Sequence, residues 1–185
     1  MANSPAERQC GSCTACCEGW LRTRVDGNEL RPGKPCAHFK QGACSIYPTR
    51  PQDPCISYIC GWLMSPELPD WLQPSVSKVI LKPNMVWERP SSNINVHIAI
   101  AVGHRIPGKT LQWLKRYSEQ TGCNFICNVP VRENKEYTGE MTKFGIGPPA
   151  FVEAVEEWSM SGYEWYIMPG STALLVGDQF YRHGK

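Results

Sequence analysis

The sequence predicts an α+β fold, in which a cysteine-rich segment at the N-terminus packs on a small β-sheet with about two helices. Three observations lead to this prediction. Eight of the ten cysteines lie between residues 10 and 60 of the 185-residue chain. Two later stretches repeat apolar residues at helical spacing, and several others alternate apolar and polar residues as strands do. We expect residues 1–64 and 65–185 to form one compact domain together.

The N-terminal segment begins with a run of closely spaced cysteines. Cys10 and Cys13 are separated by Gly-Ser, Cys13 and Cys16 by Thr-Ala, and Cys17 follows directly. Two intervening residues turn the chain back, so that both sulfurs can reach one metal ion, and Gly and Ser favour such turns. Thiolates are preferred ligands of zinc and of iron–sulfur clusters. The spacing therefore predicts a metal site without deciding between zinc and iron.

All eight cysteines of the segment are candidate metal ligands: Cys10, Cys13, Cys16, Cys17, Cys36, Cys44, Cys55 and Cys60. Eight thiolates can fill two four-sulfur sites, or one site with spare thiols. Cys16 and Cys17 point in different directions from adjacent residues and could serve different metals. Among the basic residues nearby, we expect Arg50 to offset thiolate charge, because Pro48 and Pro51 stiffen the loop around it.

The alternative is a disulfide framework, which an even number of cysteines permits. Residues 1–9 contain no apolar core that would mark a secretory signal, and the cytoplasm, where we expect the protein, is a reducing compartment. The neighbours Cys16 and Cys17 also lie closer than disulfide geometry prefers. These arguments favour metal binding over disulfides.

Other possible ligands are weaker candidates. His38 lies two residues after Cys36, and imidazole is a common zinc ligand, but eight cysteines already suffice. Cys123 and Cys127 would share one face of a strand, with a separation on the order of 13 Å. That separation is too long for one metal, so we expect these two to be small buried or incidental thiols.

Part of the segment resembles a known family. The run from Cys44 to Pro51 (Cys-Ser-Ile-Tyr-Pro-Thr-Arg-Pro), followed by Cys55, Tyr58 and Cys60 and preceded by the clustered N-terminal cysteines, is similar to the YkgJ-type cysteine-cluster family. That family is described as a domain that chelates zinc or iron through eight cysteines. The resemblance covers residues 10 to about 60 and implies metal binding, without implying an agreed reaction.

Two comparisons refine what the resemblance implies. The flagellin lysine methylases carry a related cysteine set, which suggests an iron–sulfur role there. A cluster-dependent modifying enzyme is therefore an alternative function. Bacterial ferredoxins have three residues between their third and fourth cysteines. Counted from Cys16, Trp20 stands at the fourth position here, which argues against a ferredoxin-type electron carrier.

Beyond the cysteine-rich segment, two helices are predicted. Residues 110–122 repeat Leu111, Leu114 and Tyr117 at helical spacing before Gly122, a typical C-terminal cap. Residues 149–161 form the second helix, whose apolar stripe is Phe151, Ala154, Val155 and Trp158. We expect its glutamates, Glu153, Glu156 and Glu157, to face water.

The remaining elements are predicted from alternation and turn residues. We expect a turn at 26–28, a knuckle at 36–44, a short helix at 55–63 and a linker or helical turn at 65–74. The predicted strands are 20–25, 76–82, 95–102, 123–129, 163–168 and 172–176.

A third functional hypothesis rests on Gly103 to Thr110. Gly103, four residues, then Gly108-Lys109-Thr110 fits the formal phosphate-binding pattern between a predicted strand and a predicted helix. Pro107 removes a loop donor, and no acidic metal ligand ends a nearby strand, so nucleotide binding is the lesser alternative. The stretch 144–149 lacks the third glycine and the Lys-Ser/Thr pair and is rejected as such a loop.

Composition limits the partners. The net charge of +2 with a pI near 8.0 gives no reason to expect a nucleic-acid partner. No apolar run approaches the 18 or so residues that span a bilayer, so no membrane partner is expected. The metal ion is the expected partner, and the sequence indicates no protein partner, substrate or reaction.

Overall fold

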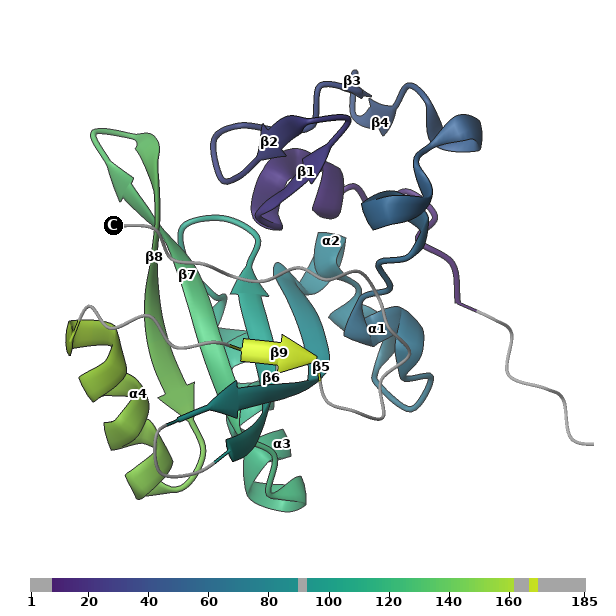
Figure 1. Ribbon diagram of the computed structural model, residues 1–185. Coiled ribbons are helices and arrows are strands. Elements are labelled where there is room, and N and C mark those ends of the chain that lie inside the picture. The colour runs from purple at the N-terminus through teal and green to yellow at the C-terminus, as the bar shows by residue number, and fades with distance from the viewer. Residues whose placement is uncertain (1–7, 90–92, 162–166, 170–185) are drawn as a thin grey trace, which may run out of the picture.

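A five-stranded mixed sheet forms one end of the molecule and the cysteine-rich segment lies at the other, as the computed structural model shows (Figure 1). The structure describes residues 8–89, 93–161 and 167–169. The strand order is β8-β7-β6-β5-β9. Only β6 and β7 run parallel, and the other neighbours are antiparallel. The predicted α+β class is confirmed.

Strands β5, β6 and β7 are longer than the sequence patterns predicted. The strands of the sheet are β5 (Val79–Glu88), β6 (Asn93–Ala101), β7 (Phe125–Glu133), β8 (Glu136–Ile146) and β9 (Ile167–Pro169). β8 was not predicted, because its residues do not alternate cleanly between apolar and polar. It pairs with β7 through a two-residue turn at Asn134 and Lys135, both at positive φ, as type I′ hairpins require. The strand predicted at 172–176 lies outside the described residues, as do residues 163–166 of the strand predicted at 163–168.

Helices α3 (Gly108–Thr121) and α4 (Pro149–Ser161) confirm the two predicted helices. Gly122 adopts the left-handed conformation and caps α3, donating its N–H to the Ser118 carbonyl at 2.8 Å. The predicted apolar stripe of α4 is buried, and its three glutamates are exposed.

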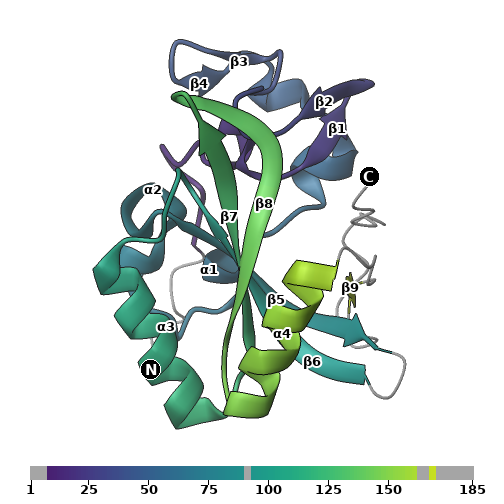
Figure 2. The ribbon, with the colours of Figure 1, turned by 90° about the vertical axis from the view of Figure 1, so that its left-hand side faces the viewer.

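The two helices pack on opposite faces of the sheet. On α3, the Tyr117 ring lies 6.1 Å from that of Phe125 in β7, and His97, the β6 partner of Phe125, shares this face. On α4, the rings of Phe151 and Trp158 lie 5.9 Å and 5.2 Å from that of Trp87. Trp87 pairs with Ile94, three positions from His97 and hence on the other face of β6. Figure 2 shows the sheet between the two helices.

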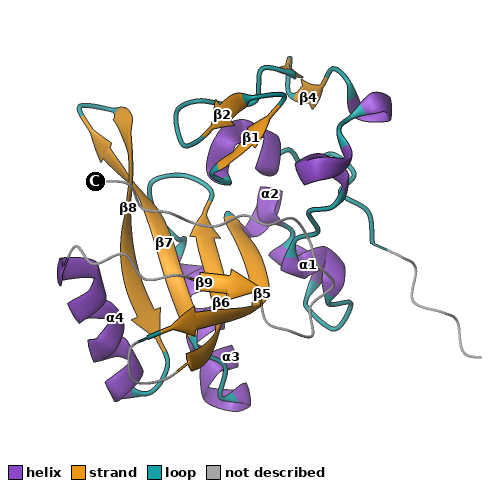
Figure 3. Ribbon diagram, in the orientation of Figure 1, coloured by secondary structure: helices purple, strands orange, loops and turns teal. Residues whose placement is uncertain are grey.

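The cysteine-rich segment consists of short elements joined by loops (Figure 3). They are η1 (Cys16–Trp20), β1 (Thr23–Val25), β2 (Asn28–Leu30), β3 (Phe39–Lys40), β4 (Ala43–Cys44), η2 (Tyr47–Thr49), η3 (Gln52–Ile56), α1 (Gly61–Met64), η4 (Asp70–Leu72) and α2 (Pro74–Ser77).

Three predictions for this region need correction. The strand predicted at 20–25 begins only at Thr23, because Trp20 belongs to η1. The helix predicted at 55–63 is two separate elements, η3 and α1, because Cys60 is extended and caps α1. The strand predicted at 76–82 begins at Val79, since Lys78 at φ +59° ends helix α2. The helical turn predicted around Trp71 is confirmed as η4.

One continuous apolar core joins the cysteine-rich segment to the sheet. Ala15, Leu21 and Trp62 are buried in the same cluster as Ile80 and Ile100 of the sheet. The β7–β8 hairpin adds a second contact, where the Tyr137 ring of β8 meets the Trp20 ring edge-on at 5.3 Å. None of the helices in the described ranges combines the length and apolarity needed to cross a membrane.

Candidate metal centre

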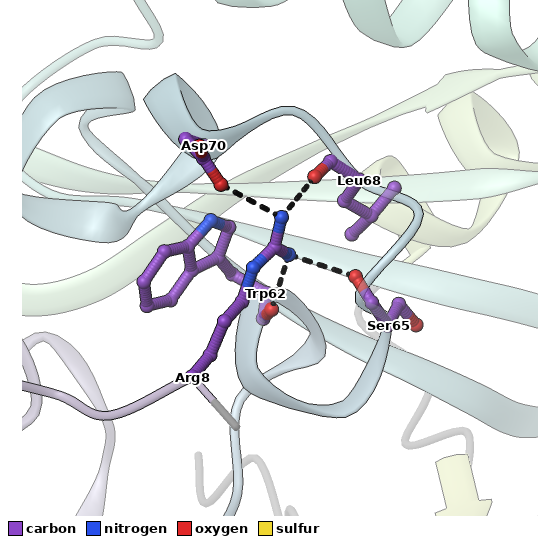
Figure 4. A network of polar contacts seen from close by, with 5 residues as sticks. All are labelled: Arg8, Trp62, Ser65, Leu68 and Asp70. Atoms are coloured by element: carbon purple, nitrogen blue, oxygen red, sulfur yellow. Dashed lines mark hydrogen bonds and ion pairs between the residues drawn. The ribbon is translucent and has the colours of Figure 1, made fainter. Parts of the chain in front are cut away.

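Arg8 anchors the chain just before the first candidate ligand (Figure 4). Its guanidinium donates to the carbonyls of Trp62 at 2.9 Å, Ser65 at 2.8 Å and Leu68, and to the carboxylate of Asp70 at 2.9 Å. The cation also lies 4.9 Å from the centre of the Trp62 ring. This network ties the backbone at Arg8 to the loop that follows Cys60.

The first ligand loop is a set of tight backbone turns. The Cys13 N–H bonds to the Cys10 carbonyl at 2.9 Å, and the Gln73 amide donates to the same carbonyl at 3.1 Å. Cys16 and Cys17 begin η1, where successive side chains diverge by roughly 100° around the helix axis. The two adjacent sulfurs therefore point in different directions, as the sequence predicted.

Two hairpins position the next ligands. The turns at Asp26-Gly27 and at Gln41-Gly42 have positive φ at both central residues, which is the type I′ geometry of two-residue hairpins. The second hairpin places Cys44 opposite Phe39. The Cys36 N–H bonds to the Cys17 carbonyl at 2.9 Å, which brings these two ligands from different elements together.

All eight predicted cysteines line one cavity of about 130 Å³. They come from loops, η1, β4 and η3, so the fold gathers residues that are up to fifty positions apart in the sequence. Apolar side chains, among them Leu21, Val25 and Leu30, form much of the remaining wall. The other two cysteines are elsewhere: Cys127 is buried within β7, and neither it nor Cys123 lines this cavity.

Packing divides these cysteines between two clusters. Cys60, Cys13 and Cys16 pack into the main core. Cys36, Cys17 and Cys55 pack instead with Val25, Leu30 and Phe39 in a separate small core. We group Cys10 with the cysteines of the main core, because its carbonyl accepts the Cys13 N–H. We group Cys44 with those of the small core, because it pairs with Phe39. We call Cys10, Cys13, Cys16 and Cys60 the first set, and Cys17, Cys36, Cys44 and Cys55 the second set.

Burial and repulsion between neighbouring thiolates raise the pKa of some of these thiols, most clearly those of Cys16 and Cys17. Burial raises the pKa of Cys16 well above its ordinary value, with Cys60, Cys13, Cys17 and Cys10 adding to the rise in that order. Burial likewise raises the pKa of Cys17 to about 12, with contributions from Cys44, Cys36 and Cys55 and least from Cys10. A nearby cation would reverse this effect, because a thiol that coordinates a metal ion is deprotonated.

Arg50 is the cationic side chain that lines the cavity. Its Nη1 donates to the Tyr47 carbonyl at 3.1 Å, and its guanidinium carbon lies 3.9 Å from the centre of the Tyr47 ring. Its Nε is buried and has no hydrogen-bond partner among the described residues. Its charge lowers the pKa of Cys10 and that of Cys55, although burial raises both overall. Arg50 therefore acts on one thiol from each set.

His38 also lines the cavity, but its ring is engaged elsewhere. Its Nε2 lies 2.9 Å from the Asp26 carboxylate, within hydrogen-bonding distance, at the β1–β2 turn.

Across the described ranges, no group of three or more His, Cys, Asp or Glu side chains is already arranged to hold a metal ion. None of the ten cysteines, all of which are described, forms a disulfide. The structure therefore brings the eight candidates to one cavity as thiols and leaves metal binding untested.

The residues of the nucleotide hypothesis are engaged within the chain. The buried Thr110 hydroxyl donates to the Ser77 carbonyl at 2.7 Å, and the Lys109 ammonium lies 4.4 Å from the centre of the Trp71 ring. These contacts occupy the two side chains that a phosphate-binding loop would direct at phosphate and Mg²⁺. They do not favour nucleotide binding, which stays an untested hypothesis.

Sequence reasoning missed Arg8. Three of the acceptors of its guanidinium are backbone carbonyls, which carry no residue-specific signal, so no pattern in the sequence could have indicated it.

Comparison of the chain with protein-family models, with curated proteins and with solved structures finds no match in any of the three. The resemblance of residues 10–60 to the YkgJ-type cysteine-cluster family therefore stays an expectation based on the motif residues.

Proposed function

We propose that this protein binds zinc or an iron–sulfur cluster through the eight cysteines of its N-terminal segment, in a reducing compartment such as the cytoplasm. The observation that carries the proposal is that all eight line a single cavity. Sulfur ligands without intervening carboxylates suit zinc and iron–sulfur clusters rather than magnesium or calcium. The cation at Arg50 would offset part of the thiolate charge.

The size of the cavity supports an inorganic occupant. At about 130 Å³, it is smaller than the 300–1,000 Å³ pockets that hold drug-sized organic ligands. A metal ion or a compact cluster needs less room than an organic cofactor. A modifying enzyme of the methylase type would need a further site, outside this cavity, for its organic substrate and cofactor.

Metal analysis of anaerobically purified protein tests the proposal. We expect zinc or iron in stoichiometric amount, with acid-labile sulfide and a brown colour if the metal is iron. The control is the double variant Cys123→Ala with Cys127→Ser. It removes two thiols outside the cavity and should still bind the metal. Protein that binds neither zinc, cobalt nor iron with sulfide under reducing conditions would refute the proposal.

A further inference from the structure

The eight cysteines are enough for one metal site with spare thiols or for two complete sites, and the packing of their side chains distinguishes these arrangements. One site would place all the thiols around a common centre in a common environment. The structure instead embeds three thiols in the main core and three in a separate small core around Val25 and Leu30.

The elements that carry the two sets are also distinct. The first set comes from the loop before η1, the start of η1 and the residue that caps α1, and Arg8 ties these pieces together. The second set comes from η1, the loop before β3, strand β4 and η3. Here the Cys36 N–H to Cys17 carbonyl bond and the Phe39–Cys44 pairing hold the pieces together.

Cys16 and Cys17 are the point where the sets meet. They are neighbours in the sequence, yet Cys16 packs with the main core and Cys17 with the small core. Their side chains leave η1 in different directions, so one residue can serve each site.

We infer that the eight cysteines form two adjacent four-sulfur sites, one made by the first set and the other by the second set. This inference rests on the proposed metal binding and adds the assignment of each ligand to its site. Four thiolates around one ion match the closed tetrahedral geometry of structural zinc sites and also the ligand number of an iron–sulfur cluster. Arg50 lines the same cavity as both sets, so its positive charge can offset thiolate charge there.

The test compares paired Cys→Ser variants with cobalt(II) as the probe, since its visible absorption reports tetrahedral thiolate coordination, and with zinc(II) for stoichiometry. The wild type should bind two equivalents. Cys10→Ser with Cys60→Ser, both in the first set, should leave one equivalent with the full four-thiolate spectrum, and so should Cys36→Ser with Cys44→Ser. Cys60→Ser with Cys44→Ser, one from each set, should leave no complete four-thiolate site.

A second measurement avoids variants that fail to fold. Wild-type protein loaded with one equivalent of zinc is alkylated briefly, and the protection of each cysteine is read by peptide mass spectrometry. Cysteines should be protected together within a set, so that the protection levels of Cys16 and Cys17 differ whenever one site fills first. If both sites fill equally, all eight cysteines are protected from alkylation to the same extent at one equivalent of zinc. The paired Cys→Ser variants then distinguish one site from two.

The outcomes separate the two proposals. Wild-type protein that binds neither cobalt nor zinc, nor iron with sulfide, would overturn metal binding itself. If the wild type binds metal but the same-set and cross-set variants lose it equally, the division into two sites is wrong. Metal binding itself would remain supported.

Discussion

At the scale of single residues, Arg50 has a buried hydrogen-bond donor that a bound ligand could satisfy. Its buried Nε–H has no acceptor among the described residues, and leaving such a donor unsatisfied costs about 1–3 kcal/mol. A metal-bound thiolate would supply the acceptor. We therefore expect Arg50→Gln to weaken cobalt or zinc binding by about tenfold or more, measured by competition with a chelator.

Two variants make the Arg50 prediction specific. Arg50→Lys should fall between the wild type and Arg50→Gln, because lysine keeps the charge but lacks the planar set of donors. Arg24→Gln removes the same charge from an exposed position on β1 and should change the affinity little. Equal losses in Arg24→Gln and Arg50→Gln would show that net charge alone matters.

Arg8 illustrates a second kind of residue, one that positions a ligand without contacting it. Arg8→Ala leaves three partly buried backbone carbonyls without their charged donor, and water can replace that donor only in part. We expect a loss of about 1–3 kcal/mol in the free energy of unfolding, measured by urea denaturation of the reduced protein, together with weaker metal binding by the first set.

The Asp70 contact serves as the matched control for Arg8. Its side chain is 94% exposed, and exposed ion pairs contribute about 0–1 kcal/mol. Asp70→Asn should therefore have little effect on unfolding. If Asp70→Asn destabilised the protein as much as Arg8→Ala does, the carbonyl contacts would not be what holds the N-terminus.

At the scale of elements, Gly19 fixes how η1 packs on the loop that follows β2. A Cβ atom at Gly19 would lie 2.5 Å from the Arg31 carbonyl oxygen and 2.8 Å from that of Lys34, and φ is +93°. Because both neighbours are backbone atoms, they cannot move aside as a flexible side chain can. Gly19→Ala should destabilise the protein by more than the roughly 1–2 kcal/mol of a left-handed residue alone, measured by thermal unfolding.

A substitution at Gly27 distinguishes the two energetic costs expected at Gly19, namely the strain of a positive φ and the clash of the added Cβ atom. It also has positive φ, +75°, but a Cβ atom there would meet nothing within 4 Å. Gly27→Ala therefore carries the backbone cost without the clash. Similar losses in both variants would mean that the close approach of η1 contributes nothing.

Local signals predicted the elements whose structure is decided locally. The Asp26-Gly27 turn and the cap at Gly122 follow from the conformational preferences of these residues, and both are observed. Strand β8 was missed because its pairing with β7 and the packing of α4 decide it. The candidate ligands were identified from their clustering and spacing in the sequence and from the family resemblance. Their division into sets depends on the packing of Val25 and Leu30, which no local pattern indicates.

At the scale of the whole molecule, the shared core couples the stability of the candidate metal centre to the stability of the sheet. Leu21 and Trp62 of the cysteine-rich segment lie in one buried cluster with Ile80 and Ile100 of the sheet, and Tyr137 of β8 contacts Trp20. Loss of structure near the cysteines would therefore expose apolar surface of the sheet. Metal binding should stabilise both parts together, since a ligand that binds only the folded state stabilises it by mass action.

Removal of the metal tests this dependence. We expect a chelator to lower the urea midpoint of a single transition, seen equally by far-ultraviolet circular dichroism, which reports the sheet, and by tryptophan fluorescence. The loss should be about 2.7 kcal/mol or more when the free metal had been at 100 times its dissociation constant, and excess zinc should restore it. Two separate transitions, with the sheet unfolding at an unchanged midpoint, would contradict a shared core and show that the cysteine-rich segment folds around its metal independently.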